Sequence, residues 1–155
     1  MKRLLLIVLP LLLIVGCSKP EPINYETTLI DRDGVFYTKD TNKPYSGPVF
    51  SLNDKGLNKR ESILEDGKMI TYTDIKWYDN GQKRLEGPWK DGKPDGLVTI
   101  WYENGQKLGE ETWKDGEKDG LWTGWYGSGK KEYERTYKDG KKNGLFIRWY
   151  ENGQK

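Results

Sequence analysis

The stretch Trp101-Tyr102-Glu103-Asn104-Gly105-Gln106-Lys107 decides the fold, because it recurs along the chain at a fixed interval. Its other copies begin at Trp77, Trp125 and Trp149, each 24 residues after the one before. The copy at Trp125 is degenerate, with Gly-Ser-Gly in place of Glu-Asn-Gly. Self-similarity at a period of a few tens of residues is typical of repeat architectures. The sequence therefore predicts a tandem array rather than a domain built around one irregular core.

A second unit lies midway between these copies. It is an aromatic residue followed by Lys-Asp-Gly, as in Trp89-Lys90-Asp91-Gly92, and it returns at Trp113 and Tyr137. Each copy is followed four residues later by another glycine and then by a leucine, as at Leu97. A degenerate copy runs from Tyr45 onward, with spacing that slips by one residue before Trp77. The repeats thus fill residues 45–155.

The glycine pairs predict β-hairpins. Short aromatic and β-branched runs bounded by Asn-Gly or Asp-Gly are a strong hairpin signal, so each repeat is strand, turn, strand and turn. Because Asn and Gly tolerate positive φ, we expect two-residue type I′ turns at Asn80-Gly81, Asn104-Gly105 and Asn152-Gly153. The Asp-Gly turns stay open between a two-residue turn and a wider loop. No stretch after residue 17 has uninterrupted helical spacing, so the prediction is all-β: an elongated, twisted antiparallel sheet of tandem hairpins.

The even period predicts which side chains share a face. Two-residue Asn-Gly turns would place Trp101 opposite Leu108 and Tyr102 opposite Lys107, whereas a bulge would merge the tryptophan columns onto one face. One face then carries a tryptophan column, a leucine column and a glutamate ladder: Trp77, Trp101, Trp125, Trp149, Leu97, Leu121, Leu145, Glu86, Glu110 and Glu134. The other face carries the candidate interaction surface: Tyr78, Tyr102, Tyr126, Tyr150, Trp89, Trp113 and Tyr137.

These units resemble the bacterial MORN-repeat variant, often labelled as antitoxins of the YwqK type. The motifs that carry the resemblance are Tyr137-Lys138-Asp139-Gly140-Lys141-Lys142-Asn143-Gly144-Leu145 and the Trp-Tyr-Glu-Asn-Gly-Gln-Lys units, over residues 45–155. The resemblance implies an elongated sheet of successive hairpins, in agreement with the turns. Its family label implies neutralisation of a toxin.

An apolar segment that holds the single cysteine precedes the repeats. Lys2 and Arg3 precede a 12-residue apolar run, residues 4–15, which is shorter than the roughly 20 residues that span a bilayer. The run Ile14-Val15-Gly16-Cys17 resembles the lipobox of bacterial lipoproteins, which implies cleavage before Cys17 and acylation of its sulfur and amine. Ser18 at the next position implies the outer membrane in a diderm cell. The alternative is an ordinary signal peptide with an incidental cysteine.

The chain thus divides into four predicted segments. Residues 1–16 form a lipoprotein signal peptide, and residues 17–30 form the acylated cysteine and a proline-containing tether. Residues 31–44 form an irregular capping hairpin around Asp33-Gly34, and residues 45–155 form the repeat domain. The sequence stops after an Asn-Gly turn, which predicts either a truncated chain or an end covered by a partner.

Charge and composition exclude several classes of function. The chain has 26 Lys and Arg against 24 Asp and Glu, and removal of residues 1–16 takes away Lys2 and Arg3 alone, which leaves a neutral mature chain. Nucleic-acid binders carry clustered excess positive charge, so no nucleic-acid partner is expected. The chain has no histidine and its one cysteine is assigned to acylation, which excludes Ser-His and Cys-His nucleophiles and His or thiolate zinc sites. We expect no enzyme activity, no metal and no cofactor.

Three features have alternative interpretations. The glutamate ladder could supply general acids for glycoside cleavage, but glutamates on an open sheet beside Lys and Arg are more simply solvated. The Asp-Gly loops lack the further oxygen ligands of a calcium loop. The aromatic columns could stack on sugars, contact a protein or pack on themselves.

The sequence therefore predicts a non-enzymatic, lipid-anchored repeat protein that presents an aromatic and charged β-surface to a protein partner at the cell envelope. The alternative is an antitoxin or immunity protein that neutralises a partner toxin. A polysaccharide-binding or polysaccharide-acting protein is a third hypothesis, and a glycan ligand is the weaker partner expectation.

Overall fold

A computed structural model describes residues 20–155 of the chain, and the predicted signal peptide and Cys17 lie outside the described residues. The fold is the predicted all-β array, with one short helix near its start. The elements before the repeats are β1 (Ile23–Asn24), α1 (Tyr25–Thr28), β2 (Leu29–Arg32) and β3 (Val35–Thr38). The repeat strands are β4 (Gly47–Leu52), β5 (Asn58–Glu65), β6 (Lys68–Trp77), β7 (Lys83–Lys90), β8 (Lys93–Pro94), β9 (Gly96–Trp101), β10 (Lys107–Lys114), β11 (Glu117–Trp125), β12 (Lys131–Lys138) and β13 (Lys141–Arg148).

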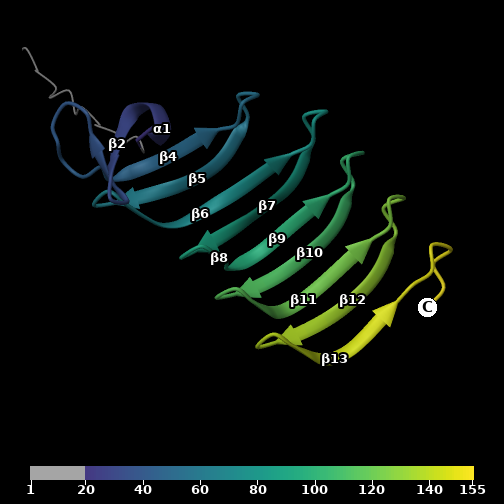
Figure 1. The fold of residues 1–155 in the computed structure, drawn as a ribbon. Coiled ribbons are helices and arrows are strands. Elements are labelled where there is room, and N and C mark those ends of the chain that lie inside the picture. Colours follow the sequence, from purple (N-terminus) through teal and green to yellow (C-terminus); the bar gives the residue numbers. More distant parts are fainter. Residues whose placement is uncertain (1–19) are drawn as a thin grey trace, which may run out of the picture.

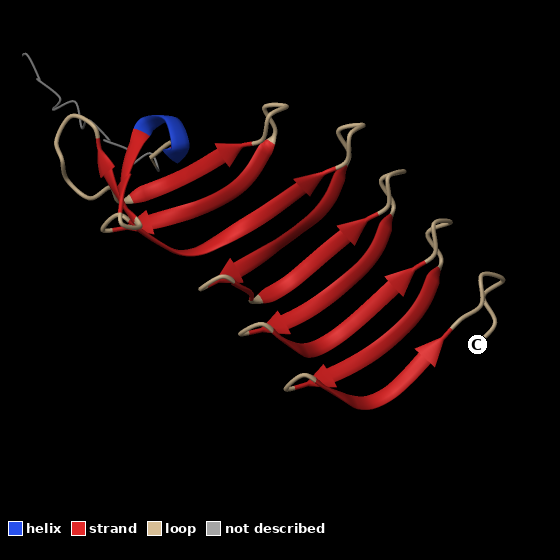
Figure 2. Ribbon diagram, in the orientation of Figure 1, coloured by secondary structure: helices blue, strands red, loops and turns tan. Residues whose placement is uncertain are grey.

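These strands form one long sheet in which neighbours in sequence are neighbours in space (Figure 1). Its order is β1-β4-β5-β6-β7-β9-β10-β11-β12-β13, with β8 paired to β7. All pairs are antiparallel except β1 with β4, which is parallel. The sheet is a single layer whose hairpin turns line its two long edges (Figure 2). Within residues 20–155 no helix is long and apolar enough to cross a membrane.

The Asp-Gly pairs form the tight turns. Asp115 has φ 49° and Gly116 has φ 87°, and Lys114 pairs directly with Glu117, so only two residues lie in the loop. Two consecutive positive φ angles are what a type I′ turn requires, and Asp tolerates that conformation better than most residues. The same geometry recurs in the other Asp-Gly turns of the sheet, at Asp66, Asp91 and Asp139. The choice that the sequence left open is thereby settled as a two-residue turn.

The Asn-Gly pairs form a different turn from the predicted one. Gly105 has φ 82°, but Asn104 does not have positive φ, so the type I′ prediction was wrong. Tyr102 N–H donates to the carbonyl of Gln106 at 2.8 Å, and Gly105 N–H donates to the carbonyl of Tyr102 at 3.0 Å. Three residues therefore lie in the loop, and only the glycine takes the left-handed conformation. The side-chain oxygen of Asn104 accepts the N–H of Gln106, which gives asparagine a structural role without positive φ.

The wider turn changes the strand register only next to the loop. Trp101 pairs with Lys107, not with Leu108 as predicted, and Leu108 is the extra residue of a bulge. Beyond that bulge Ile100 pairs with Gly109 and Thr99 with Glu110, which is the register that a two-residue turn would give. The bulge absorbs the added loop residue, so the tryptophan columns stay on separate faces.

The first described residues form a cap rather than the tether expected over residues 17–30. Tyr25 and Leu29 are buried against Val49 and Leu64, which are 1% and 0% exposed. The ring of Tyr25 meets Phe36 of β3 edge to face, with centroids 5.2 Å apart. The separate hairpin β2–β3 turns at Asp33-Gly34. The segment has no periodic pattern because its elements are only two to four residues long and its apolar residues meet one end of the sheet.

Candidate functional site

One face of the sheet repeats the same side chains in every unit, and we call it the uniform face. Paired residues in an antiparallel sheet lie on the same face, so the pairs Trp101 with Lys107, Thr99 with Glu110 and Leu97 with Thr112 define three columns across the strands. The recurring members of this face are Trp77, Trp101, Trp125, Trp149, Lys83, Lys107, Lys131, Glu86, Glu110, Glu134, Leu97, Leu121 and Leu145. This is the face predicted for the tryptophan, leucine and glutamate columns.

Lysines neutralise the glutamates of the uniform face and cover its tryptophans. Lys83 Nζ lies 2.7 Å from a carboxylate oxygen of Glu86, and the corresponding pairs recur between Lys107 and Glu110 and between Lys131 and Glu134. Lys83 Nζ also lies 5.8 Å from the ring centroid of Trp77 and 5.6 Å from that of Trp101. Each glutamate thus has a cationic partner in its own repeat, which is the arrangement expected for a solvated ladder.

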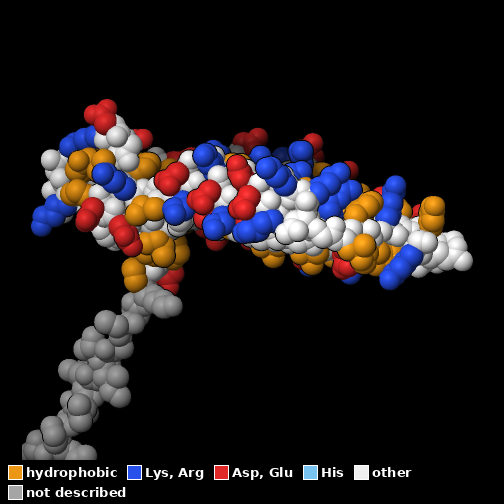
Figure 3. Space-filling model, turned by 90° about the horizontal axis from the view of Figure 1, so that it is seen from below, with side chains coloured by type: hydrophobic (Ala, Val, Ile, Leu, Met, Phe, Trp, Pro, Cys, Tyr) orange, Lys and Arg blue, Asp and Glu red, His pale blue; other side chains and the backbone are white. Residues whose placement is uncertain are grey.

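The leucine column of the uniform face is open to solvent. Leu97 is 51% exposed, Leu121 50% and Leu145 74%. Between β4 and β7 the same face holds a groove of about 610 Å³, lined among others by Phe50, Ile63 and Pro88. Figure 3 shows hydrophobic side chains along the lower margin of the molecule and charged side chains between its two margins. Exposed apolar rows with a polar border are typical of interaction surfaces.

The opposite face differs from repeat to repeat, and we call it the varied face. Its central row reads Val98, Glu111, Trp122, Arg135 and Phe146 across five consecutive strands. The aromatic rings lie on one another: Trp122 is 8% exposed, and its ring centroid lies 5.1 Å from Trp113 and 5.2 Å from Tyr137. Because the sheet has no second layer, these large side chains supply its packing.

Glycines on the varied face make room for the large side chains of neighbouring strands. A Cβ placed on Gly124 would lie 2.2 Å from the ring of Tyr133, and one on Gly87 would lie 2.7 Å from Val98. Both distances are far below van der Waals contact. Large and small residues therefore alternate between neighbouring strands, and a change on one strand constrains the next.

Two titratable groups of the varied face are perturbed. Burial raises the pKa of the Glu111 carboxyl above its ordinary value of 4.5, against the hydrogen bond to Trp113 and the charge of Lys118, which lower it. Burial likewise raises the pKa of the Tyr133 hydroxyl, and the negative charges of Glu111 and Glu132 act in the same direction. Lys118 lies over the ring of Trp122, with its Nζ 4.2 Å from the centroid.

The structure divides the predicted interaction surface between two places. Trp89, Trp113 and Tyr137 lie on the varied face near the Asp-Gly edge. The tyrosine column lies in the loops of the Asn-Gly edge, at the other end of the strands: Tyr78, Tyr102, Tyr126 and Tyr150. With about 3.3 Å per strand residue, the six residues from Lys83 to Trp89 separate these groups by roughly 20 Å.

Most of the tyrosine column ties one turn to the next. The hydroxyl of Tyr102 donates to the carbonyl of Trp125 at 2.9 Å, and Tyr78 and Tyr126 make the same bond to the following repeat at 2.8 Å. Tyr150 is 68% exposed. No local pattern in the sequence indicates these bonds, since donor and acceptor lie 23 residues apart.

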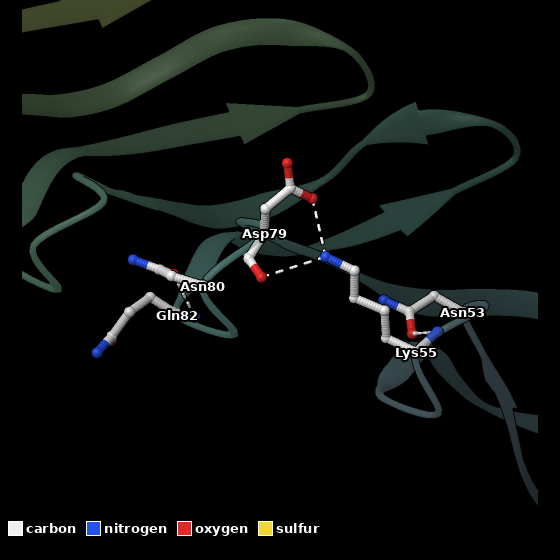
Figure 4. A network of polar contacts seen from close by, with 5 residues as sticks. All are labelled: Asn53, Lys55, Asp79, Asn80 and Gln82. Carbon is white, nitrogen blue, oxygen red and sulfur yellow. Dashed lines mark hydrogen bonds and ion pairs between the residues drawn. The ribbon is translucent and has the colours of Figure 1, made fainter.

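Asparagine and lysine side chains extend this ladder of turns. The side-chain amide of Asn80 donates to the carbonyl of Glu103 at 2.9 Å, and Asn104 donates to the carbonyl of Gly127 at 3.1 Å. In the first, degenerate turn Lys55 replaces asparagine: its Nζ lies 2.8 Å from the Asp79 carboxylate and 3.2 Å from its carbonyl (Figure 4). Hydrogen bonding to Lys55 lowers the pKa of Asp79 below its usual value. Successive turns are thus linked along the whole Asn-Gly edge.

Acidic side chains do not gather into a metal site within residues 20–155. The glutamates of the uniform face stand in separate repeats, each beside a lysine.

Comparison with protein families identifies the MORN repeat variant in this chain, at residues 94–115 and 118–139. The first match begins at Pro94, the last residue of β8, and covers β9 and β10; the second covers β11 from its second residue, and β12. The chain therefore contains MORN repeats over residues 94–139, and the same hairpin architecture extends to both sides of them. No curated protein and no solved structure matches the chain.

Proposed function

We propose that this protein is a non-enzymatic, lipid-anchored repeat protein that binds a protein partner at the cell envelope through its uniform face. MORN repeats often mediate protein or membrane interaction, which is compatible with this role. The lipobox at residues 14–17 supports anchoring through Cys17. In a diderm cell the residue after the cysteine, Ser18, favours the outer membrane.

The exposed leucine column is the observation that carries the binding proposal. Leu97, Leu121 and Leu145 recur once per repeat on a face whose neighbouring glutamates already have lysine partners. Burial of a leucine side chain is worth about 1.5–3 kcal/mol, and an exposed row offers that gain to a partner. The buried aromatics of the varied face already make such contacts within the chain.

Anchoring is tested by metabolic labelling with a fatty-acid analogue. The parent chain should incorporate label and fractionate with the membrane, and Cys17→Ala should lose both. Equal labelling of the Cys17→Ala chain would refute acylation at this residue.

Partner binding is tested by capture from the native envelope with the tethered chain. Leu121→Ser should weaken capture in part, and the added change Leu97→Ser should deepen the loss, because each repeat contributes one leucine. Phe146→Ser, at a varied-face residue of similar exposure (48%), is the matched control and should leave capture unchanged. Capture that depends on Phe146 and not on the leucines would place the binding site on the varied face and contradict the proposal.

Neutralisation of an envelope-acting or contact-delivered toxin is a narrower form of the same proposal, favoured by the lipobox together with the antitoxin label of the family. Co-expression with a toxin encoded beside it should then restore growth, and Leu97→Ser/Leu121→Ser should abolish that rescue.

A further inference from the structure

The leucine column is flanked by two rows of different composition. In β10 the uniform face presents Glu110, Thr112 and Lys114 at alternate positions, and β7 and β12 repeat the pattern of glutamate, proline or threonine, and lysine. In β11 the same face presents Asp119, Leu121 and Thr123. One side of the column is thus a row of glutamate and threonine, and the other is a row of lysine and aspartate.

A two-fold axis along this column makes the face complementary to itself. Such an axis leaves the leucine column in place and exchanges the two rows, so that Glu110 faces Lys114 of a second copy, and Glu86 and Glu134 face Lys90 and Lys138 in the same way. Each contact joins opposite charges, and the glutamate keeps the lysine of its own repeat as a second partner. Leu121 then meets its own equivalent on the axis.

The spacing of the repeats points to the same partner. One repeat advances the column by two strands, or about 9.5 Å. A second copy has the same step by construction, so an apolar contact formed at one repeat is formed at the next. The buried contacts of the cap lie on the varied face, where Val49 pairs with Ser62, and Ser62 with Tyr72, which in turn pairs with Trp89. On the uniform face the segment before β1 reaches the groove between β4 and β7, which Pro22 helps to line.

We infer that the partner of the uniform face is a second copy of this chain, with the two sheets packed face to face as an aligned sandwich about an axis along the leucine column. The inference rests on the proposed function and names its partner. An axis in this direction keeps both caps at the same end of the pair. Two chains anchored through Cys17 in one membrane need that arrangement.

Photo-crosslinking of the full chain in its native membrane tests the pairing. A benzoylphenylalanine at position 121 should give an adduct of twice the chain mass that contains peptides of this chain alone. The same probe at position 146, on the varied face and of similar exposure, should give no such adduct. An adduct of position 121 with a different protein would overturn the second copy as partner and leave the proposed function standing. The absence of an adduct at both positions would overturn the pairing of two copies and the proposed function alike.

A charge exchange supplies the second readout. Glu110→Lys would bring two lysines together across the interface, so the adduct at position 121 should fall about tenfold or more. Adding Lys114→Glu to the same chain recreates the opposite charges and should restore the adduct. Loss in both variants, or in neither, would contradict the two-fold arrangement. Equal circular dichroism of the parent and both variants shows that folding is unaffected.

Discussion

The two faces of the sheet are built by opposite rules. On the uniform face the tryptophan, lysine, glutamate and leucine of one repeat return in the next, and on the varied face they do not: positions 24 residues apart hold Val98, Trp122 and Phe146. The large buried rings lie on the varied face, as at Trp122, whereas the leucines of the uniform face are half exposed or more. The varied face thus supplies the packing of the large rings, and the uniform face presents its leucines to solvent.

Packing in a single layer explains the variation. A side chain of the varied face can be buried only beneath its neighbours on adjacent strands, so a large residue needs a small one beside it, as Tyr133 needs Gly124. The varied face meets this requirement with different residues in different repeats, with Gly87 beside Val98 and Gly124 beside Tyr133. The uniform face has no such constraint, and its identity from repeat to repeat suits a partner with the same step.

Removal of Trp122 should give the largest loss of stability. Trp122→Ala takes away the ring that contacts both Trp113 and Tyr137, and large-to-small changes of a buried aromatic cost about 3–5 kcal/mol. Its sequence neighbour on the other face is the matched control: Leu121→Ala should cost about 0.5 kcal/mol or less. Chemical unfolding of both variants measures the contrast, and equal losses would remove the distinction between the faces.

Filling the space at Gly124 should give the next largest effect. Gly124→Ala places a methyl group against the ring of Tyr133, and overpacking of this kind costs about 1–3 kcal/mol. Gly127→Ala is the control, because a Cβ there meets nothing within 4 Å. The unfolding midpoints of the two variants should differ clearly. A Gly124→Ala chain as stable as the parent would show that Tyr133 moves aside without cost.

The tyrosine column tests the comparison at the Asn-Gly edge of the sheet, where its hydroxyl groups hold neighbouring repeats together. Tyr102→Phe removes the hydroxyl that donates to Trp125 and should cost about 1 kcal/mol. Tyr150→Phe, at a 68% exposed residue, should leave the unfolding free energy unchanged. If both changes are neutral, the hydroxyl bonds between turns contribute nothing to stability.

Much of this arrangement could be predicted from the sequence. The period of 24 residues and the glycine turns gave the hairpins, and evenness of the period gave the columns of the uniform face. The turn types could not be predicted from the dipeptides alone, because the bulge at Leu108 lets a three-residue loop keep the register of a two-residue one.

The cap and the tyrosine bonds were beyond sequence reasoning for another reason. Tyr25 and Leu29 are buried by contacts with strands that lie far along the chain, and no local pattern records such contacts. The exposed tyrosine surface was predicted from face alternation, but Tyr102 lies in a loop, where alternation does not apply, and its hydroxyl is already bonded.

Glu111 gives the smallest expected effect, and it depends on pH. Its raised pKa means that the folded chain binds this proton more readily than the unfolded chain, so its stabilising contribution is present below about pH 4.5 and is lost as the pH rises through the raised pKa. Glu111→Gln should therefore raise the melting temperature relative to the parent at pH 7 and not at pH 3. Glu110→Gln on the uniform face is the control. A gain that is the same at both pH values would contradict burial as the cause.

The central claim is that the leucine column of the uniform face serves binding and not folding. The most direct test is one chain with Leu97→Ser, Leu121→Ser and Leu145→Ser that carries the benzoylphenylalanine at position 112, beside Leu97 in the same column. The unfolding free energy and the crosslinked adduct are measured in the same preparation, and the parent for comparison is the chain with this probe and the three leucines. The account predicts a loss of about 0.5 kcal/mol or less for each substitution, together with disappearance of the adduct. An unfolded chain, or a folded chain that still forms the adduct at the parental level, would contradict it.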